Sequence, residues 1–174
     1  MTPIAANEMA DLLKKSWMTH DAMWFRSCLE ACGIEKTNQI NRAAIYGAAK
    51  IEVKRLARRL GVEQIASFDA LGDFIQQATA IIQADFMQFT CEAPRPNVLR
   101  WEMHRCFAYE GVSRLGVIDR YQCGIFERLK GWLDGLGVAY AITPEGDDCM
   151  MHREGRCFRE FHFAFGQANQ SSLS

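Results

Sequence analysis

The chain has 174 residues, of which 49% are hydrophobic and 24% charged, a composition typical of one globular domain. Its formal net charge of -1 gives no long-range field to attract nucleic acid, and no apolar run is long enough to span a bilayer. The N-terminus lacks the features of a signal peptide, and seven cysteines, an odd number, argue against a disulfide framework. We therefore expect a cytoplasmic domain that binds neither nucleic acid nor membrane.

The first half of the chain is predicted to be helical. Apolar residues recur every three or four positions over residues 7–32 and 37–60, and again from Ser67 to about Asp85. Gly33 and Gly61 stand where the first two helices should end, and Ser67 can cap the third. We expect this helical half to span about residues 7–88.

The first helix carries a polar pair among aromatic side chains. His20 shares a face with Trp17 and Trp24, since it lies three residues after one and four before the other, and Asp21 lies beside that face. Most simply, His20 makes one hydrogen bond at the edge of the core. It could also line a ligand pocket with Trp17, Trp24 and Phe25, or act with Asp21 as an acid–base pair, so that His20 and Asp21 are the catalytic candidates.

The second half is predicted to mix strands and helices. Residues 98–104 alternate, with Trp101 on an apolar side and Glu102 on a polar side, which is typical of a strand. Asp119 can cap a helix that runs to about Leu136. Two further strands are expected, over residues 138–143 and 157–165.

These elements together predict an α+β fold. The helical half should pack on a small antiparallel sheet, and one long helix should separate strands in the mixed half, about residues 97–165. We expect a single domain over residues 1–166. Residues 167–174 are polar and are expected to form a disordered tail.

The cysteine spacing in this half suggests a metal site. Cys149 and Cys157 flank an Arg-Glu-Gly centre that suits a short hairpin, and a symmetric hairpin would place their Cβ atoms roughly 4.5 to 5.5 Å apart. Two thiolates at that spacing can share a zinc ion, which in structural sites has four ligands. Glu102 and Cys123 are our candidates for the other two. The alternative is three buried thiols without a metal.

The same segment resembles a known family. Cys123, the run Gly-Trp-Leu-Asp-Gly-Leu-Gly over residues 131–137, and the pair Cys149 and Cys157 with Gly155 between them are similar to the C-terminal half of 4-vinyl-reductase-type domains. The resemblance covers roughly residues 97–165. Domains of this kind bind small molecules, occur alone or in bacterial aromatic-sensing activators, and often form dimers.

The resemblance implies a metal-ligand set and its role. In the metal-binding members, one strand glutamate and three cysteines hold zinc, and the separations here, 21, 26 and 8 residues, match that order and favour Glu102 over His104. Four protein ligands make a closed site, so the zinc would be structural. Three thiolates and a carboxylate leave the site with a net charge of -2, so basic donors such as Arg153, Arg156 or Arg159 should surround it.

Three functions are therefore in competition. The first is a zinc-braced small-molecule-binding domain, possibly a sensor, with Trp101 among the aromatic wall residues. The second is a hydrolase of a cyclic or amide-like compound, because the N-terminal half resembles an uncharacterised bacterial family grouped with 2-aminothiazoline-4-carboxylate hydrolases. The third is a dimeric assembly module without a ligand. We expect a homodimer in the first case also.

Overall fold

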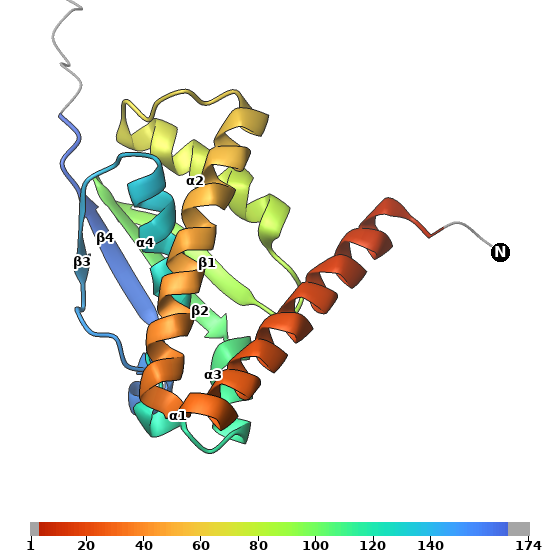
Figure 1. The fold of residues 1–174 in the computed structure, drawn as a ribbon. Coiled ribbons are helices and arrows are strands. Elements are labelled where there is room, and N and C mark those ends of the chain that lie inside the picture. Colours follow the sequence, from red (N-terminus) through yellow and green to blue (C-terminus); the bar gives the residue numbers. More distant parts are fainter. Residues whose placement is uncertain (1–3, 167–174) are drawn as a thin grey trace, which may run out of the picture.

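The computed structural model describes residues 4–166, in which five α-helices and one 3-10 helix accompany a four-stranded antiparallel sheet. The α+β prediction is confirmed (Figure 1). Residues 167–174, where we predicted a tail, lie outside the described part. Among the helices that the structure describes, none is both long and apolar enough to cross a membrane.

Helix α1 (Ala6–Leu60) is two helices joined at a kink. At the kink Gly33 has φ 73° and ψ 172°, a backbone conformation that side chains with a Cβ rarely adopt. The predicted ends at Gly33 and Gly61 are thus both helix-breaking positions, since Gly61 caps the C-terminus in the left-handed conformation. We call residues 6–32 the arm and residues 34–60 the core segment. The arm leaves the kink at an angle and projects from the body (Figure 1).

The sheet comprises β1 (Gln88–Arg95), β2 (Val98–Arg105), β3 (Tyr140–Thr143) and β4 (Phe158–Phe163), in the order β1-β2-β4-β3. The predicted alternation in β2 is confirmed, because Leu99, Trp101 and Met103 are buried while the polar residues between them are more exposed. Strand β1 fills the interval between the two predicted halves. The apolar face of the sheet contributes to the main core with the helices.

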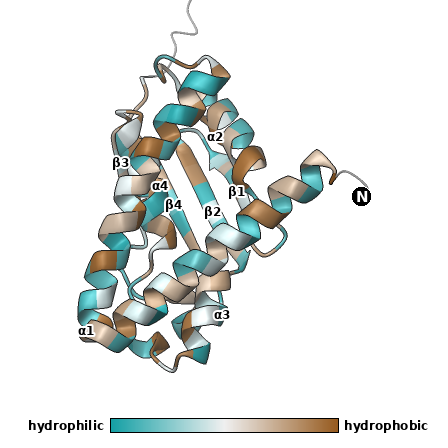
Figure 2. Cartoon of the chain, turned by 45° about the vertical axis from the view of Figure 1, so that its right-hand side comes forward, coloured by the Kyte–Doolittle hydropathy of each residue, from teal (hydrophilic) through white to brown (hydrophobic). Residues whose placement is uncertain are grey.

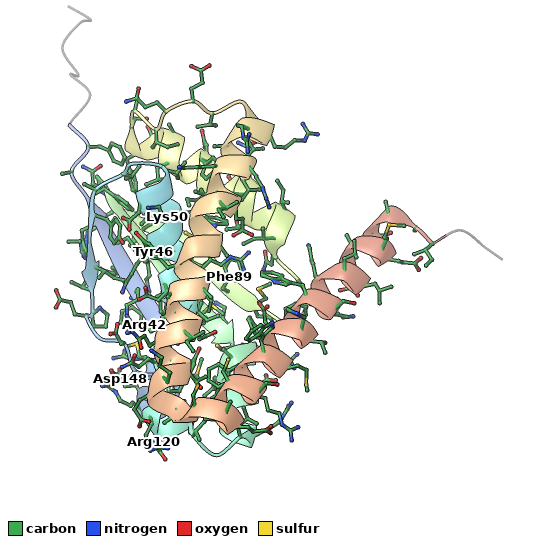
Figure 3. All side chains as sticks on the ribbon, in the orientation of Figure 1. Arg42, Tyr46, Lys50, Phe89, Arg120 and Asp148 are labelled. Carbon is green, nitrogen blue, oxygen red and sulfur yellow. The ribbon has the colours of Figure 1, made fainter. Side chains whose placement is uncertain are left out.

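The core segment packs against α4 (Ile125–Gly135) at close range. A Cβ atom added to Gly131 would lie 2.7 Å from the Cβ of Ala49, so only glycine permits this approach. Polar contacts flank the apolar contact. Arg42 forms salt bridges with Glu127 and Asp147, and the Tyr46 hydroxyl donates a hydrogen bond to Asp134 at 2.5 Å. Arg42 and Tyr46 are labelled on the core segment in Figure 3.

Helix α2 (Phe68–Ile82) adds a second layer of apolar side chains to this core. Its predicted cap is confirmed: the backbone N–H of Ala70 donates to the Ser67 hydroxyl at 3.1 Å. Leu71 and Ala78 are fully buried on its inner face.

The segment from Asp119 to Cys157 differs from its predicted structure. A 3-10 turn (Ile118–Arg120) precedes an extended stretch, and α4 begins only at Ile125, because the Asn38 side chain binds the backbone of Arg120 and Gln122 in place of helical partners. The predicted hairpin is instead a short helix, α5 (Met150–Glu154), which Gly155 ends in the left-handed conformation. Cys123 therefore precedes a helix, and Cys149 and Cys157 flank one.

Candidate functional site: a cysteine cluster and a buried tryptophan

Four cysteines from different segments gather at one end of the sheet. Cys106 caps α3 (Phe107–Arg114), Cys123 precedes α4, and Cys149 and Cys157 flank α5. Cys106, Cys149 and Cys157 are buried, and Cys123 is half-buried against both apolar clusters of the protein. The sequence analysis missed Cys106, because residues 106–116 fit either a helix or an extended hairpin.

Backbone pairing explains why Cys123 and Cys149 are neighbours. Gln122 and Asp148 form an isolated antiparallel bridge, and the N–H of Cys123 donates to the carbonyl of Asp147 at 2.5 Å. In such a pair the side chains of residues 123 and 149 lie diagonally on one face. The salt bridge from Arg42 to Asp147, 2.7 Å long, ties this segment to the core segment.

Cys157 is held by the end of β2. The N–H of Met103 donates to the carbonyl of Cys157 at 2.8 Å, which continues the β2–β4 ladder by one residue beyond Phe158. Three residues after Met103 the chain reaches Cys106, whose sulfur accepts a hydrogen bond from the N–H of Tyr109 at 3.5 Å. The two thiols thus share one edge of the core.

The four thiols lie close enough to influence one another. Burial, together with the nearby Cys123 and Cys106, raises the pKa of Cys157 to about 12. Burial likewise raises the pKa of Cys106 to about 12, with Cys123 and Cys149 adding to the shift. These thiols are therefore protonated at neutral pH unless a cation stabilises the thiolates.

A buried cation already lies beside them. Arg159 is only 4% exposed, donates to the carbonyls of Phe158 and Gly146, and stacks on Phe126 at 4.8 Å. Within residues 4–166 no carboxylate lies within ion-pairing distance of its guanidinium. Although burial dominates and raises the pKa values of Cys123, Cys149 and Cys157, the charge of Arg159 lowers all three.

Glu102 does not belong to this cluster. It pairs with Phe158 across the sheet and binds Arg100 at 3.0 Å on the polar face, where its side chain is 33% exposed. Met103 and Cys157, one position further along the ladder, turn towards the opposite, buried face. The predicted set of Glu102, Cys123, Cys149 and Cys157 is therefore not brought together, because the alternation of the strand places Glu102 on the wrong side.

The four cysteine sulfurs are neighbours, but they are not arranged as the coordination shell of a metal ion. In the part of the chain that the structure describes, no three histidine, cysteine or acidic side chains are grouped closely enough to hold a metal ion. A hollow of about 240 Å³ borders the cluster at Cys123 and is lined by charged side chains of both signs, Glu127, Lys130, Glu145, Asp147 and Arg159. A metal ion that bound here would have to draw the four thiols together. It could reach Cys123 through the hollow.

Trp101 has a different environment, within the apolar layer above the sheet. It is 6% exposed and stacks on Phe89, with ring centroids 4.6 Å apart. Its indole Nε1 is buried and has no hydrogen-bond partner among residues 4–166. Trp132 provides a contrast, since its Nε1 donates to Glu52 at 2.8 Å.

The other predicted pocket residues lie on the arm, and they do not enclose a site with Trp101. Trp17 and Trp24 are 46% and 59% exposed, whereas Phe25 is half-buried and packs edge-on against Tyr121. His20 is exposed, and its Nδ1 lies 3.7 Å from the Asp21 carboxylate. Histidine and aspartate adjacent on an exposed helix have no third group to orient them for acid–base catalysis.

Comparison with known proteins identifies the family of the chain. Residues 4–127 match the model of a family of unknown function (DUF6125), which is more than half of the chain, so the protein belongs to this family. The matched region includes the arm, Trp101, Cys106 and Cys123. Neither a curated protein nor a solved structure matches the chain.

Proposed function

We propose that this protein is a small-molecule-binding domain whose interior is braced by a zinc ion held by buried cysteines. The observation that carries the binding function is the Nε1 of Trp101, a buried donor without a partner. Leaving such a group unsatisfied costs about 1 to 3 kcal/mol, so native proteins rarely keep one without a reason.

The surroundings of Trp101 define the class of ligand. Phe89 covers one face of the indole, and the other neighbours in this layer are the apolar side chains of the core. A flat, largely apolar compound with one acceptor atom, such as an aromatic carbonyl, phenol or carboxylate, would suit the site. Because Trp101 lies in the packed core and does not line the hollow at Cys123, such a ligand would have to displace core side chains before its acceptor could take the Nε1–H bond.

The experiment compares Trp101→Phe with the unaltered protein. Phenylalanine keeps an aromatic ring and removes the N–H, so ligands that accept this bond should bind about tenfold more weakly, in line with a net hydrogen bond of about 1.4 kcal/mol. Thermal-shift screening of small aromatic carbonyls, phenols and carboxylates would find the ligand, and calorimetry would measure its affinity. Trp24→Phe, on the exposed arm, is the matched control.

Two results would contradict the binding function. One is a screen in which no such compound raises the melting temperature. The other is equal loss of affinity in Trp24→Phe and Trp101→Phe. Without ligand, Trp101→Phe should not lower the free energy of unfolding by loss of a hydrogen bond, because the Nε1 of Trp101 donates none within residues 4–166.

The zinc brace rests on Arg159 and the donor set. Burying a charge costs several kcal/mol unless opposite charges compensate it, and thiolates near Arg159 would add to the compensation that Asp148 provides. Cys106 takes the place predicted for Glu102, which gives four thiolates. The formal charge of four thiolates and one Zn²⁺ is -2, and including Arg159 reduces the net charge of the site to -4 + 2 + 1 = -1. Bound there, zinc would tie α3, α4 and α5 to the end of β4.

A further inference from the structure

The arm presents two different faces. Its half-buried residues, Asp11, Lys14, Met18, Phe25, Cys28 and Leu29, face the body of the same chain. On the opposite side lie six large apolar residues, which we call the outer stripe: Met9, Leu12, Leu13, Trp17, Met23 and Trp24. Their exposed fractions run from 46% to 63%. Hydrophobic colour is visible along the arm in Figure 2.

The outer stripe is a continuous helical face. Its members recur at spacings of three, four and seven residues, and at about 100° per residue they cover an arc of roughly 140°. Such a width is typical of a helix face that packs against another element. Within residues 4–166 the body reaches the edge of the stripe at Trp17, through Arg128 of α4, yet all six side chains are at least 46% exposed, and the stripe holds six of the ten large hydrophobic side chains that are exposed in these residues.

The inner face explains why the arm stays in place without its outer face being covered. The ammonium of Lys14 donates to the carbonyl of Gln83 at 2.6 Å, and Phe25 packs on Tyr121. At the edge between the two faces, the guanidinium of Arg128 lies 5.0 Å from the Trp17 ring. The body thus fixes the direction of the arm. The outer stripe is presented on a held helix, so binding it requires little further ordering.

The charge of the arm decides between possible occupants. Residues 6–32 contain four acidic and three basic side chains, 3 - 4 = -1, so the arm lacks the basic face that draws amphipathic helices to anionic membranes. Residues 167–174 include only one large apolar side chain, Leu173, and cannot match six. A second arm matches the stripe in length and polarity, and its near-zero charge causes little repulsion.

The order of residues along the arm suits an antiparallel pair with two-fold symmetry. The stripe runs from Met9 to Trp24, and at its midpoint Ser16 offers a small side chain where two helices would cross. Glu8 and Arg26 lie nine residues before and nine after Trp17, and five turns apart, hence on one flank. A crossing at Ser16 places Glu8 opposite Trp24 of the partner subunit and two residues, about 3 Å along the helix, from Arg26 of the partner subunit, a distance that these two long side chains can span.

We propose that two copies of this chain associate through their outer stripes, as antiparallel arms that cross at Ser16. Half-exposed side chains of this size each present on the order of 100 Å². Six of them give about 600 Å² per copy, which approaches the roughly 800 Å² per partner of a stable interface. The flanking Glu8 and Arg26 pairs fix the antiparallel orientation.

Sedimentation or light scattering of the full chain tests the pairing. The wild type should have about twice the 19.8 kDa mass of one chain, and Leu13→Glu should have the mass of one chain. Ile51→Glu is the matched control, because Ile51 is 56% exposed on the core segment and should leave the dimer intact. Circular dichroism of each variant keeps folding and association apart.

The crossing point and orientation have their own test. Ser16→Cys should give a disulfide-linked dimer on mild oxidation, much faster than the wild type, whose exposed Cys32 lies far from the crossing. Glu8→Arg should raise the dissociation constant several-fold, and Glu8→Arg with Arg26→Glu should restore it. A monomeric wild type, a dimer that survives Leu13→Glu, or a monomer that binds lipid vesicles through the arm would overturn the proposal.

Discussion

At the scale of single residues, Cys106 and Arg159 define the metal hypothesis most sharply. Both are buried, one as a fourth thiol beside three others and the other as a cation without a carboxylate partner. The charge of Arg159 lowers the pKa of Asp148 as well as those of three of the thiols, and zinc thiolates would add negative charge on the cysteine side of its guanidinium. The identity of the fourth ligand can therefore be tested by substitution.

We predict that Cys106→Ser weakens zinc binding by more than about tenfold, since even losses outside the coordination shell commonly cost 10- to 100-fold. Zinc content after expression with added zinc, followed by competition with a chromophoric chelator, measures the effect. Cys91→Ser and Glu102→Gln are the controls and should retain zinc. Cys91 is partly buried on β1, and none of the four clustered thiols is among the groups that shift its pKa.

Two observations would refute this assignment. Wild-type protein without zinc under these conditions would remove the brace altogether. Loss of zinc in Glu102→Gln, with retention in Cys106→Ser, would restore the carboxylate as the ligand. Neither result bears on the ligand test at Trp101, because that measurement needs no metal.

The sequence contained part of this site. Alternation in residues 98–104 placed Trp101 on the buried side, and the same alternation, applied consistently, would have excluded Glu102 from a buried cluster. Cys106 could not be found in this way, because it follows the strand at a helix cap. Arg159 lies two and four residues before the buried Phe161 and Phe163, hence on the same face of β4, so the alternation of this strand would have indicated its burial.

At the scale of elements, the contact between the core segment and α4 positions the cysteine cluster. Gly131 permits it, because its missing side chain leaves room for Ala49 and for the backbone carbonyl of Tyr46, 2.8 Å from where a Cβ would lie. Helix α4 follows Cys123 directly, so a shift of α4 would move that thiol. Packing and site geometry are therefore coupled here.

Gly131→Ala should accordingly destabilise the protein by about 1 to 3 kcal/mol, the usual cost of overpacking a tight contact. Gly72→Ala is the matched control: Gly72 lies inside α2 with no atom within 4 Å of an added Cβ. That change should stabilise by about 0.5 to 1 kcal/mol through helix propensity. Urea denaturation would measure both, and equal effects of one sign would show that the close approach is unimportant.

The helices of the first half were predictable, whereas the segment between Asp119 and Cys157 was not. Gly33, Gly61 and Ser67 are local signals that act within a few residues of the boundary they set. The extended stretch before α4 depends on Asn38, more than 80 positions away in the chain. No local pattern reports such a contact, and so the predicted helix began too early.

At the scale of the whole molecule, the dimer surface that we propose on the arm is separate from the ligand site that we propose in the interior. Helical periodicity predicted the arm correctly but assigned its aromatic face to an internal pocket. A single sequence cannot distinguish a face that packs within one chain from a face that packs between chains, since both require the same spacing. The body's contacts with the inner face of the arm make this distinction.

Association through the arm has a consequence for stability. Because only folded chains would associate into the dimer, the melting temperature should rise with protein concentration by mass action. For an interface that dissociates on unfolding, each tenfold rise in concentration adds about 1.4 kcal/mol per dimer. We expect a rise of a few degrees per decade of concentration for the wild type and for Ile51→Glu. Leu13→Glu, measured by calorimetry over the same range, should show a constant melting temperature, and the same slope in all three would place the interface elsewhere.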